Sequence, residues 1–542
     1  MLAVNLTNLV SRCPQTLACV CKLQHWLPHY FRDLPVVTAP VYVSEMSWRT
    51  CFRKADLSRS LAGLTFILLV LFTIPSAGQS TEKPLDCTQL IAWLTGGVSS
   101  HRLSQLVQER SIAFTADEAV SKTLLTAGAD AAFIQNLHTL HALPMSAVAC
   151  PATLAQAGDL IRHKQHDEAD RLLRKLVAAD PRNAALHFAY GYLRQQQEDW
   201  DGAFDEYSDS RDLMPGSSET HSRLAYIYYR HDDGDNAIAE ARTALSIDPR
   251  NAEAYRYLGL GHYANDQYAA ALRAFQQSLA REPRNADVYY DMGITLRDKG
   301  DRTGAAAAYR QALALNPGLW QAHNNLGMLL HDLGRHDEAI TQYLRAKRLA
   351  PQEPVIRHNL GNTYCDKGDF DAAISEFREL FKMNPGWQRG HNSLGKAFMA
   401  KRDYENAISE LQLAILQNPT APVEHRLLGQ ALLIVQKQQE ALRELRIAVA
   451  LDPNSSLAHH YLGTALYNDE DYAAAATEFR RSLQLQPNAS NHYFLAACLI
   501  GLNKYDEALA ELEVAAKLEP RQDLYRARKQ ELLKLMRVSS PR

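Results

Sequence analysis

Prolines recur along most of the chain at one fixed interval. Neighbouring prolines of this series are always 34 residues apart, at positions 181, 215, 249, 283, 317, 351, 385, 419, 453 and 487. Such a constant interval requires one structural unit repeated many times, and it argues against several unrelated domains. The 542 residues are therefore explained as a repeat array with additions at its ends.

Alanine and glycine keep the same interval and indicate that each unit is a pair of helices. Alanines stand at 169, 203, 237, 271, 305, 339, 373, 407, 441 and 475, and a glycine, often after leucine, precedes most of them. Two helices approach closely only where side chains are small, so these columns predict helix crossings. Proline cannot continue a helix, so its column predicts the end of the second helix. Gly300, Gly334 and Gly368 are expected to end the first helix in a left-handed conformation.

This pattern of Leu-Gly, then Ala-x-x-x-aromatic, then Pro resembles the tetratricopeptide repeat. Residues 320 to 353 contain each part of it, at Leu326, Gly327, Ala339, Tyr343 and Pro351. The resemblance implies the all-α class, and together with the N-terminal apolar segment described below it predicts a secreted or membrane-anchored bacterial protein. Its expected fold is a right-handed superhelical α-solenoid of about eleven repeats.

The regions flanking the repeats divide the chain further. The array is expected over residues 150–521, followed by a capping helix and tail at 522–542, because a solenoid needs polar ends. Residues 79–149 contain three or four short helical patterns separated by glycine and aspartate, which predict a small all-helical module. The function of this module is not readable from its residues.

An apolar segment near the N-terminus has the layout of a signal peptide. Residues 61–75 are apolar, basic residues precede them, and Ser76, Ala77 and Gly78 follow. A membrane span needs about 20 apolar residues, so cleavage is favoured, with an anchor at 61–77 as the alternative. In both cases the remainder is expected outside the cytoplasm, periplasmic or secreted. Residues 46–78 form this leader, and residues 1–45 are interpreted as a mis-assigned start or a disordered extension.

Four of the eight cysteines follow the apolar segment. Cys87 and Cys150 bracket the helical module, where an oxidising compartment would let them form a disulfide. The alternative is two unrelated buried thiols. Cys365 and Cys498 lie in separate repeats and are expected to be small core residues.

A column rich in histidine stands four residues before the glycine column. Its members are His187, His221, Tyr255, Tyr289, His323, Arg357, His391, His425 and His459. Equivalent positions of successive repeats should be at least about 8 to 10 Å apart, whereas two nitrogens on one zinc lie within roughly 4 Å. We therefore expect an interhelical packing role, with pH sensitivity if the rings are buried, and no metal site.

No constellation of catalytic residues is apparent. The Gly259–Ala264 segment matches a relaxed dinucleotide motif but lies in a predicted helix, where that motif cannot form its turn after a strand. His163 and His166 lack further ligands. A net charge of -3 does not indicate the strongly basic surface that binding to nucleic-acid phosphates requires. The sequence predicts no enzyme activity, no cofactor, no nucleic-acid partner, and membrane contact through the N-terminal apolar segment alone.

The first helices of the repeats are expected to line a concave groove. Its early positions are aromatic: Tyr192, Tyr226, Tyr229, Tyr263 and Tyr290. Its middle positions are polar or basic: Asn324, His358, Asn362, Arg389, Asn392, Lys396 and Arg426. The second set loosely resembles the clamp by which some tetratricopeptide domains hold a terminal carboxylate, although the order of Lys and Asn differs.

These features predict a non-catalytic protein- or peptide-binding scaffold or adaptor of the cell envelope, whose ligand lies in the groove. The alternative is a self-associating or envelope-complex assembly component that uses its edges and caps. A third, more distant interpretation is carbohydrate binding, which only the groove tyrosines favour.

Overall fold

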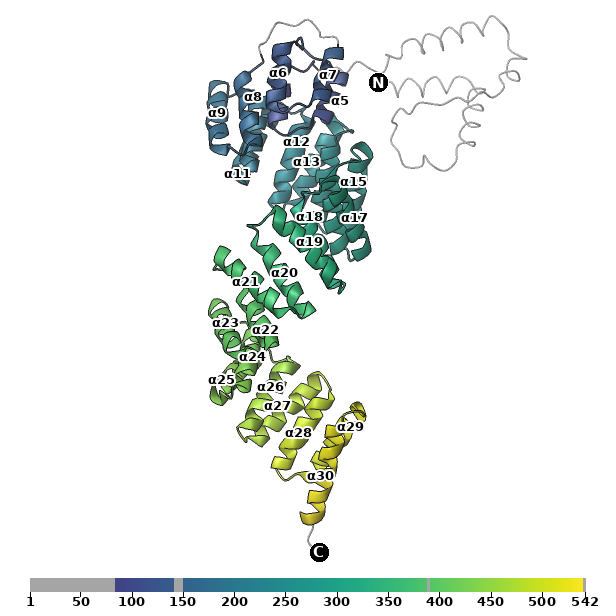
Figure 1. Ribbon diagram of the computed structural model, residues 1–542. Helices are drawn as coiled ribbons and strands as arrows, with labels where there is room; N and C mark the ends of the chain where they lie inside the picture. Colours follow the sequence, from purple (N-terminus) through teal and green to yellow (C-terminus); the bar gives the residue numbers. More distant parts are fainter. Residues whose placement is uncertain (1–82, 141–149, 388–389, 540–542) are drawn as a thin grey trace, which may run out of the picture. The chain divides into compact units, whose positions relative to one another are not determined.

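The computed structural model describes residues 83–140, 150–387 and 390–539 (Figure 1). Over these residues the chain forms 27 α-helices and no strands. The predicted all-α class is therefore confirmed. The predictions for residues 1–45 and 46–78, and that for Arg389, concern positions outside the described residues. Within the described ranges, no helix is both long and apolar enough to cross a membrane.

Helices α8 to α29 form eleven consecutive hairpins, which confirms the predicted solenoid of repeats. We call the first helix of each hairpin the A helix and the second the B helix, and the two sides of the array the A face and the B face. The A helices are α8 (Ala152–Arg162), α10 (Ala184–Gln196), α12 (Ser218–Arg230), α14 (Ala252–Ala264), α16 (Ala286–Asp298), α18 (Trp320–Asp332), α20 (Pro354–Lys367), α22 (Gly390–Lys401), α24 (Pro422–Ile434), α26 (Ser456–Asn468) and α28 (Ala489–Gly501). The B helices are α9 (His166–Ala179), α11 (Trp200–Leu213), α13 (Gly234–Ile247), α15 (Tyr268–Arg281), α17 (Arg302–Leu315), α19 (His336–Leu349), α21 (Phe370–Met383), α23 (Tyr404–Gln417), α25 (Gln438–Leu451), α27 (Tyr472–Leu485) and α29 (Tyr505–Leu518).

The glycine column lies where the A and B helices of one hairpin cross. A methyl group at Gly327 would lie 2.8 Å from the Tyr343 ring, and one at Gly361 would lie 2.7 Å from the Phe377 ring. Both rings are fully buried. Glycine is therefore needed here to let a large aromatic side chain of the B helix enter the crossing.

Every hairpin turns through one residue in the left-handed conformation. Gly300, Gly334 and Gly368 adopt it, as predicted. In the other eight hairpins a non-glycine residue does so, with φ between 56° and 63°: Lys164, Glu198, Asp232, Asp266, Arg402, Gln436, Glu470 and Asn503. The left-handed conformation costs such a residue about 1–2 kcal/mol. Tertiary packing of the hairpin therefore imposes this turn even where local preference opposes it.

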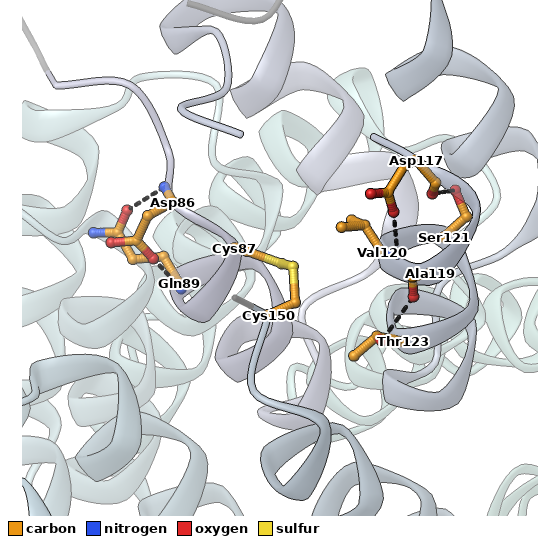
Figure 2. Close-up of a disulfide and its surroundings, with 9 residues drawn as sticks. All are labelled: Asp86, Cys87, Gln89, Asp117, Ala119, Val120, Ser121, Thr123 and Cys150. Atoms are coloured by element: carbon orange, nitrogen blue, oxygen red, sulfur yellow. Dashed lines mark hydrogen bonds between the residues drawn. A yellow bond between two sulfur atoms is a disulfide. The ribbon is translucent and has the colours of Figure 1, made fainter. Parts of the chain in front are cut away.

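Four short helices precede the array: α4 (Cys87–Thr95), α5 (Ser100–Arg110), α6 (Glu118–Ala127) and α7 (Ala131–Thr139). We call residues 83–140 the N-terminal module. Each helix begins at a side chain that accepts a hydrogen bond from its first turn, from Asp86, Ser99, Asp117 and Asp130 respectively. Figure 2 shows two of these caps, at Asp86 and Asp117.

A disulfide joins the module to the first repeat. Cys87, the first residue of α4, is bonded to Cys150, just before α8, with 5.3 Å between their Cα atoms (Figure 2). Cys498 is buried and Cys365 is half-buried, and both thiols are reduced. Burial raises the pKa of Cys365 to about 11 and that of Cys498 to about 12.

The N-terminal module packs on the A face of the first repeats. Helix α4 contacts α8 and α10, and a methyl group at Gly97 would lie 2.6 Å from the Tyr192 ring. The Arg223 guanidinium in α12 donates to the Gly96 carbonyl at 3.1 Å. In α5, buried Arg102 forms ion pairs with Glu219 at 2.8 Å and Asp248 at 2.6 Å. The A face of the first three repeats is therefore covered by the chain itself.

The array ends with α30 (Asp523–Ser539), which packs against α29. The Tyr525 ring lies 5.5 Å from the Tyr493 ring in α28. Lys529 pairs with Glu513 of α29 at 2.8 Å. This helix covers the apolar end of the last repeat, in the place expected for a capping helix.

Candidate functional site

Side chains of the A face form hydrogen bonds across repeat junctions at a constant separation of 35 residues. Four successive junctions contain such a pair: Arg256 with Asp291 at 2.6 Å, Tyr290 with Asn325 at 3.2 Å, Asn324 with Asn359 at 3.1 Å, and His358 with Ser393 at 3.3 Å. Three predicted ligand residues, Tyr290, Asn324 and His358, therefore connect one repeat to the next. Asn324 is also buried.

The predicted aromatic part of the surface is engaged in internal contacts. Tyr192 lies against Gly97 of the N-terminal module, is half-exposed, and lines a cleft between that module and the first repeats, so its predicted place in a ligand groove stays a prediction. Tyr226 packs on Trp200 and on neighbouring tyrosines. The Tyr263 hydroxyl donates to Asp298 at 2.6 Å, and burial is the main cause that raises the pKa of Tyr229 and Tyr290. Sequence reasoning missed this because the module has no place in the 34-residue period.

The polar part of the predicted surface lies on α20, α22 and α24. The Asn362 amide lies 3.4 Å from the His358 ring nitrogen, one helical turn away. The Asn392 amide nitrogen donates to Glu424 of the next A helix. The Oδ1 atom of Asn392 is buried and accepts no hydrogen bond within the described chain. The Trp387 indole N–H is also buried and donates no hydrogen bond there. A buried polar atom without a hydrogen bond lowers the stability of the fold, and a ligand could supply the missing hydrogen bonds.

Two cations of these helices form no ion pair among the described residues, although the Glu424 carboxylate acts electrostatically on Arg426. Lys396 is exposed and lies one turn after Asn392 on α22. Arg426 is half-buried on α24, and burial lowers its pKa against the opposing effects of Tyr461 and Glu424. A partly desolvated guanidinium that forms no ion pair is stabilised by an incoming anion. The cations and amides on these helices form the candidate site: Asn362, Asn392, Lys396 and Arg426.

The histidine column has a regular partner that sequence reasoning missed. The imidazole Nδ1 lies next to a B-helix carboxylate 19 residues later: His187 with Glu206, His221 with Glu240, His391 with Glu410, His425 with Glu444 and His459 with Glu478, at 2.5 to 2.7 Å. In four of these, Nε2 also lies 3.0 to 3.2 Å from a carbonyl of the proline column, at Pro181, Pro215, Pro419 and Pro453. These four rings thus join their A helix to a B helix and a turn, and His391 joins its A helix to a B helix.

The signal for this pairing is present within the chain. Where the column has Tyr255 or Tyr289, the position 19 residues later is alanine, at Ala274 and Ala308, so the glutamate is absent where the histidine is absent. His187, Glu206 and Asp209 lie close enough to hold a cation. However, both ring nitrogens of His187 already have acceptors, Glu206 and Pro181, so packing accounts for this group.

The repeat pattern identifies the family. A family model described as Tetratricopeptide repeat matches residues 154–218, 222–286, 258–294, 290–354 and 358–422. The chain is a tetratricopeptide-repeat protein. A second model, described as Anaphase-promoting complex, cyclosome, subunit 3, matches residues 444–515 of this tetratricopeptide-repeat protein. No curated protein matches the chain in sequence.

Solved structures resemble this tetratricopeptide-repeat protein in fold alone. Yeast Tom70 is 14% identical, with 72% of this chain and 96% of that chain covered and a TM-score of 0.34. A chain of the APC/C hetero-tetramer Cut9–Hcn1 is 15% identical, with 71% of this chain and 90% of that chain covered and a TM-score of 0.37. PilF of Pseudomonas aeruginosa is 19% identical, with 44% and 99% covered and a TM-score of 0.34.

Proposed function

We propose that this tetratricopeptide-repeat protein is a non-catalytic adaptor that binds a protein or peptide along the A face of α20, α22 and α24. The observation that carries the proposal is that Lys396 and Arg426 form no ion pair among the described residues and share this surface with the unsatisfied Oδ1 of Asn392. These groups complement a peptide that offers a carboxylate and backbone N–H groups.

The position of the N-terminal module supports the same location for the ligand. Contacts of Gly96, Gly97 and Arg102 cover the A face of the first three repeats. In the next repeats, A-face side chains are paired across the junctions. On the A face from α20 onward, cations and amides have hydrogen-bonding groups without partners in the described chain. A ligand therefore forms the most new hydrogen bonds there.

We further propose that the adaptor acts outside the cytoplasm, in the cell envelope. Two features support this: the apolar segment 61–77 with its basic flank, as a signal peptide or an inner-membrane anchor, and the Cys87–Cys150 bond, which is typical of oxidising compartments.

The test is a crosslinking pull-down from envelope fractions with residues 80–542, which form one compact unit. A fourfold variant removes the candidate site: Asn362→Ala, Asn392→Ala, Lys396→Ala and Arg426→Ala. We expect the wild-type chain to capture a partner with crosslinks on α20, α22 and α24, and the variant to bind that partner at least tenfold more weakly, a loss of about 1.4 kcal/mol.

A matched control carries four polar-to-alanine changes on the B face of the same three repeats. These are exposed residues: Lys382→Ala, Asn406→Ala, Gln412→Ala and Arg443→Ala. The control should capture the partner as wild type does. Equal capture by the A-face variant, or crosslinks confined to the B face, would contradict the proposal.

A further inference from the structure

A cleft of about 480 Å³ opens on the B face between α17 and α19. Helix α18 contributes His323 and Leu326 to its lining, and Leu313 and Leu349 contribute from the two B helices. The Leu349 side chain is 46% exposed. The cleft therefore offers apolar surface on the side of the array opposite the candidate site of the A face.

The charged groups of this cleft all have the same sign. Arg310, Arg345 and Arg348 are exposed residues of its lining, which contains no acidic residue. None of the three guanidinium groups has a carboxylate partner among residues 83–140, 150–387 and 390–539. In most other repeats with histidine in this column a glutamate lies next to the ring, but here His323 meets the neutral Gln342 at 2.8 Å. The cleft is therefore suited to an anionic partner that also carries an apolar side chain.

The complementary surface is found on α11 of the same chain. Asp201, Asp205, Asp209 and Asp212 recur at intervals of three or four residues, which places them along one face of the helix. The side chains of Asp201, Asp209 and Asp212 are 97%, 64% and 70% exposed. Their existing contacts are peripheral: Asp201 with His231 at 3.6 Å, Asp209 with His187 at 3.7 Å, and Asp212 with the adjacent Arg211 at 2.9 Å. Leu213, 41% exposed, follows this stripe.

The two surfaces cannot meet within one chain. Helix α11 belongs to the second repeat, and the cleft lies between the fifth and sixth repeats. Each repeat packs on its neighbours, and α13 and α15 stand between the two surfaces. Contact between the acidic stripe and the arginine cleft therefore requires two copies of the chain.

We propose that the cleft docks the acidic face of α11 from a second copy, so that copies associate B face to B face. The carboxylates of α11 meet the three guanidinium groups, and Leu213 adds to the apolar floor near Leu349. A two-fold pair places each α11 in the cleft of the other copy, whereas a one-sided contact leaves one cleft open for a further copy; in both arrangements the mean mass rises with concentration. Three cations at one cleft do not make a continuous track for nucleic acid, which needs many phosphate contacts.

The first test is light scattering of residues 80–542 over a range of protein concentrations. At about 50 mM salt, the mean mass should rise with concentration. At about 1 M salt the screening length falls to about 3 Å, so the protein should return to monomer. A monomer at every concentration and low salt would overturn the proposal, and so would association that strengthens with salt, because apolar contact would then dominate.

A charge exchange tests the two named surfaces. One variant reverses the cleft, with Arg310→Glu, Arg345→Glu and Arg348→Glu. The other reverses the stripe, with Asp205→Lys, Asp209→Lys and Asp212→Lys. Each variant alone should remain monomeric, because both of its surfaces then have the same sign. An equimolar mixture should associate at least as strongly as wild type, since every contact between unlike variants is again opposite in charge.

Restored association in the mixture also shows that both variants are folded. Failure of the mixture to associate, with native circular dichroism for both variants, would overturn the assignment of these surfaces. The matched control is Arg443→Glu with Arg446→Glu, two exposed arginines on α25 that should leave association unchanged. The fourfold A-face variant should also associate as wild type does, so failure of the adaptor proposal is distinguishable from failure of this one.

Discussion

The His221 imidazole lies between two acceptors, with Nδ1 2.6 Å from Glu240 Oε2 and Nε2 3.0 Å from the Pro215 carbonyl. Two acceptors require two N–H donors, and only the imidazolium has both. Burial alone would lower the pKa of His221, but the hydrogen bonds to Glu240 and Pro215 outweigh it and raise the pKa above 6.5. Arg211, near Glu240, opposes this shift weakly.

We predict that repeats two and three lose stability as the pH rises. The hydrogen bond to Glu206 raises the pKa of His187 as well. A pKa raised by folding contributes stability that is complete below the unfolded value of 6.5 and is lost as the pH rises through the folded value. Hydrogen exchange in α10 to α13 should therefore accelerate from about pH 6 upward, after correction for intrinsic exchange.

The control for this pH effect is His187→Gln with His221→Gln, which keeps one hydrogen bond at each site and removes the titration. This variant should be less stable at low pH and show a flatter pH profile than wild type. Parallel profiles for the two proteins would contradict the assignment.

The crossing of α18 and α19 predicts a cost for adding a single methyl group. Gly327→Ala places that group 2.8 Å from the Tyr343 ring, which is fully buried. We expect destabilisation of about 1–3 kcal/mol, measured by chemical unfolding, because the ring has no space into which it can move. Gly216→Ala is the control, since nothing lies within 4 Å of the added group. A loss as large for Gly216→Ala as for Gly327→Ala would contradict this explanation.

The left-handed turn residues predict sites where glycine stabilises the protein. Glu470 is exposed and has φ of 63°, a conformation that glycine adopts without strain. Glu470→Gly removes the cost of the left-handed conformation but increases the conformational entropy of the unfolded chain. The net effect should be a free energy of unfolding higher by about 0.5–1 kcal/mol. The reverse change, Gly368→Ala, should lower it by a similar amount. Thermal unfolding of both variants checks the two signs together.

The Cys87–Cys150 bond predicts a local effect of reduction. It closes a loop between residues 63 positions apart, for which the chain-entropy estimate is about 4 kcal/mol. Cys87→Ser with Cys150→Ser should therefore increase hydrogen exchange in the N-terminal module and α8, and leave α26 to α29 unchanged. In the unreduced, denatured protein only Cys365 and Cys498 should react with an alkylating reagent, among the cysteines after residue 82. Alkylation of Cys87 without reductant would contradict the bond.

Much of the fold was readable because it repeats. Small residues are required at each helix crossing and proline ends most of the B helices, so ten prolines at one constant interval predicted the hairpins, and the predicted number of about eleven is the number observed. The left-handed turns were predicted only at Gly300, Gly334 and Gly368. At Arg402 and Glu470 packing imposes the same conformation, and neither residue type predicts a left-handed turn.

The candidate site was predicted in part. Asn362, Asn392, Lys396 and Arg426 share the A-helix positions from which they were chosen, because period and helix geometry place them there. The sequence did not predict which of the aromatic positions are accessible to a ligand. Contacts such as Gly97 with Tyr192, and Gly96 with Arg223, join segments that are far apart in the chain and outside the period.

The amino-acid sequence by itself determined the repeat unit, its copy number and the side chains of each face, since these follow from local periodicity and steric size. Only the tertiary structure decided which of those side chains remain open. It placed the N-terminal module on the first A helices and paired five of the column histidines with a glutamate. It also brought Arg310 beside Arg345 and Arg348, because the stacking of neighbouring hairpins sets distances that spacing along the chain does not contain.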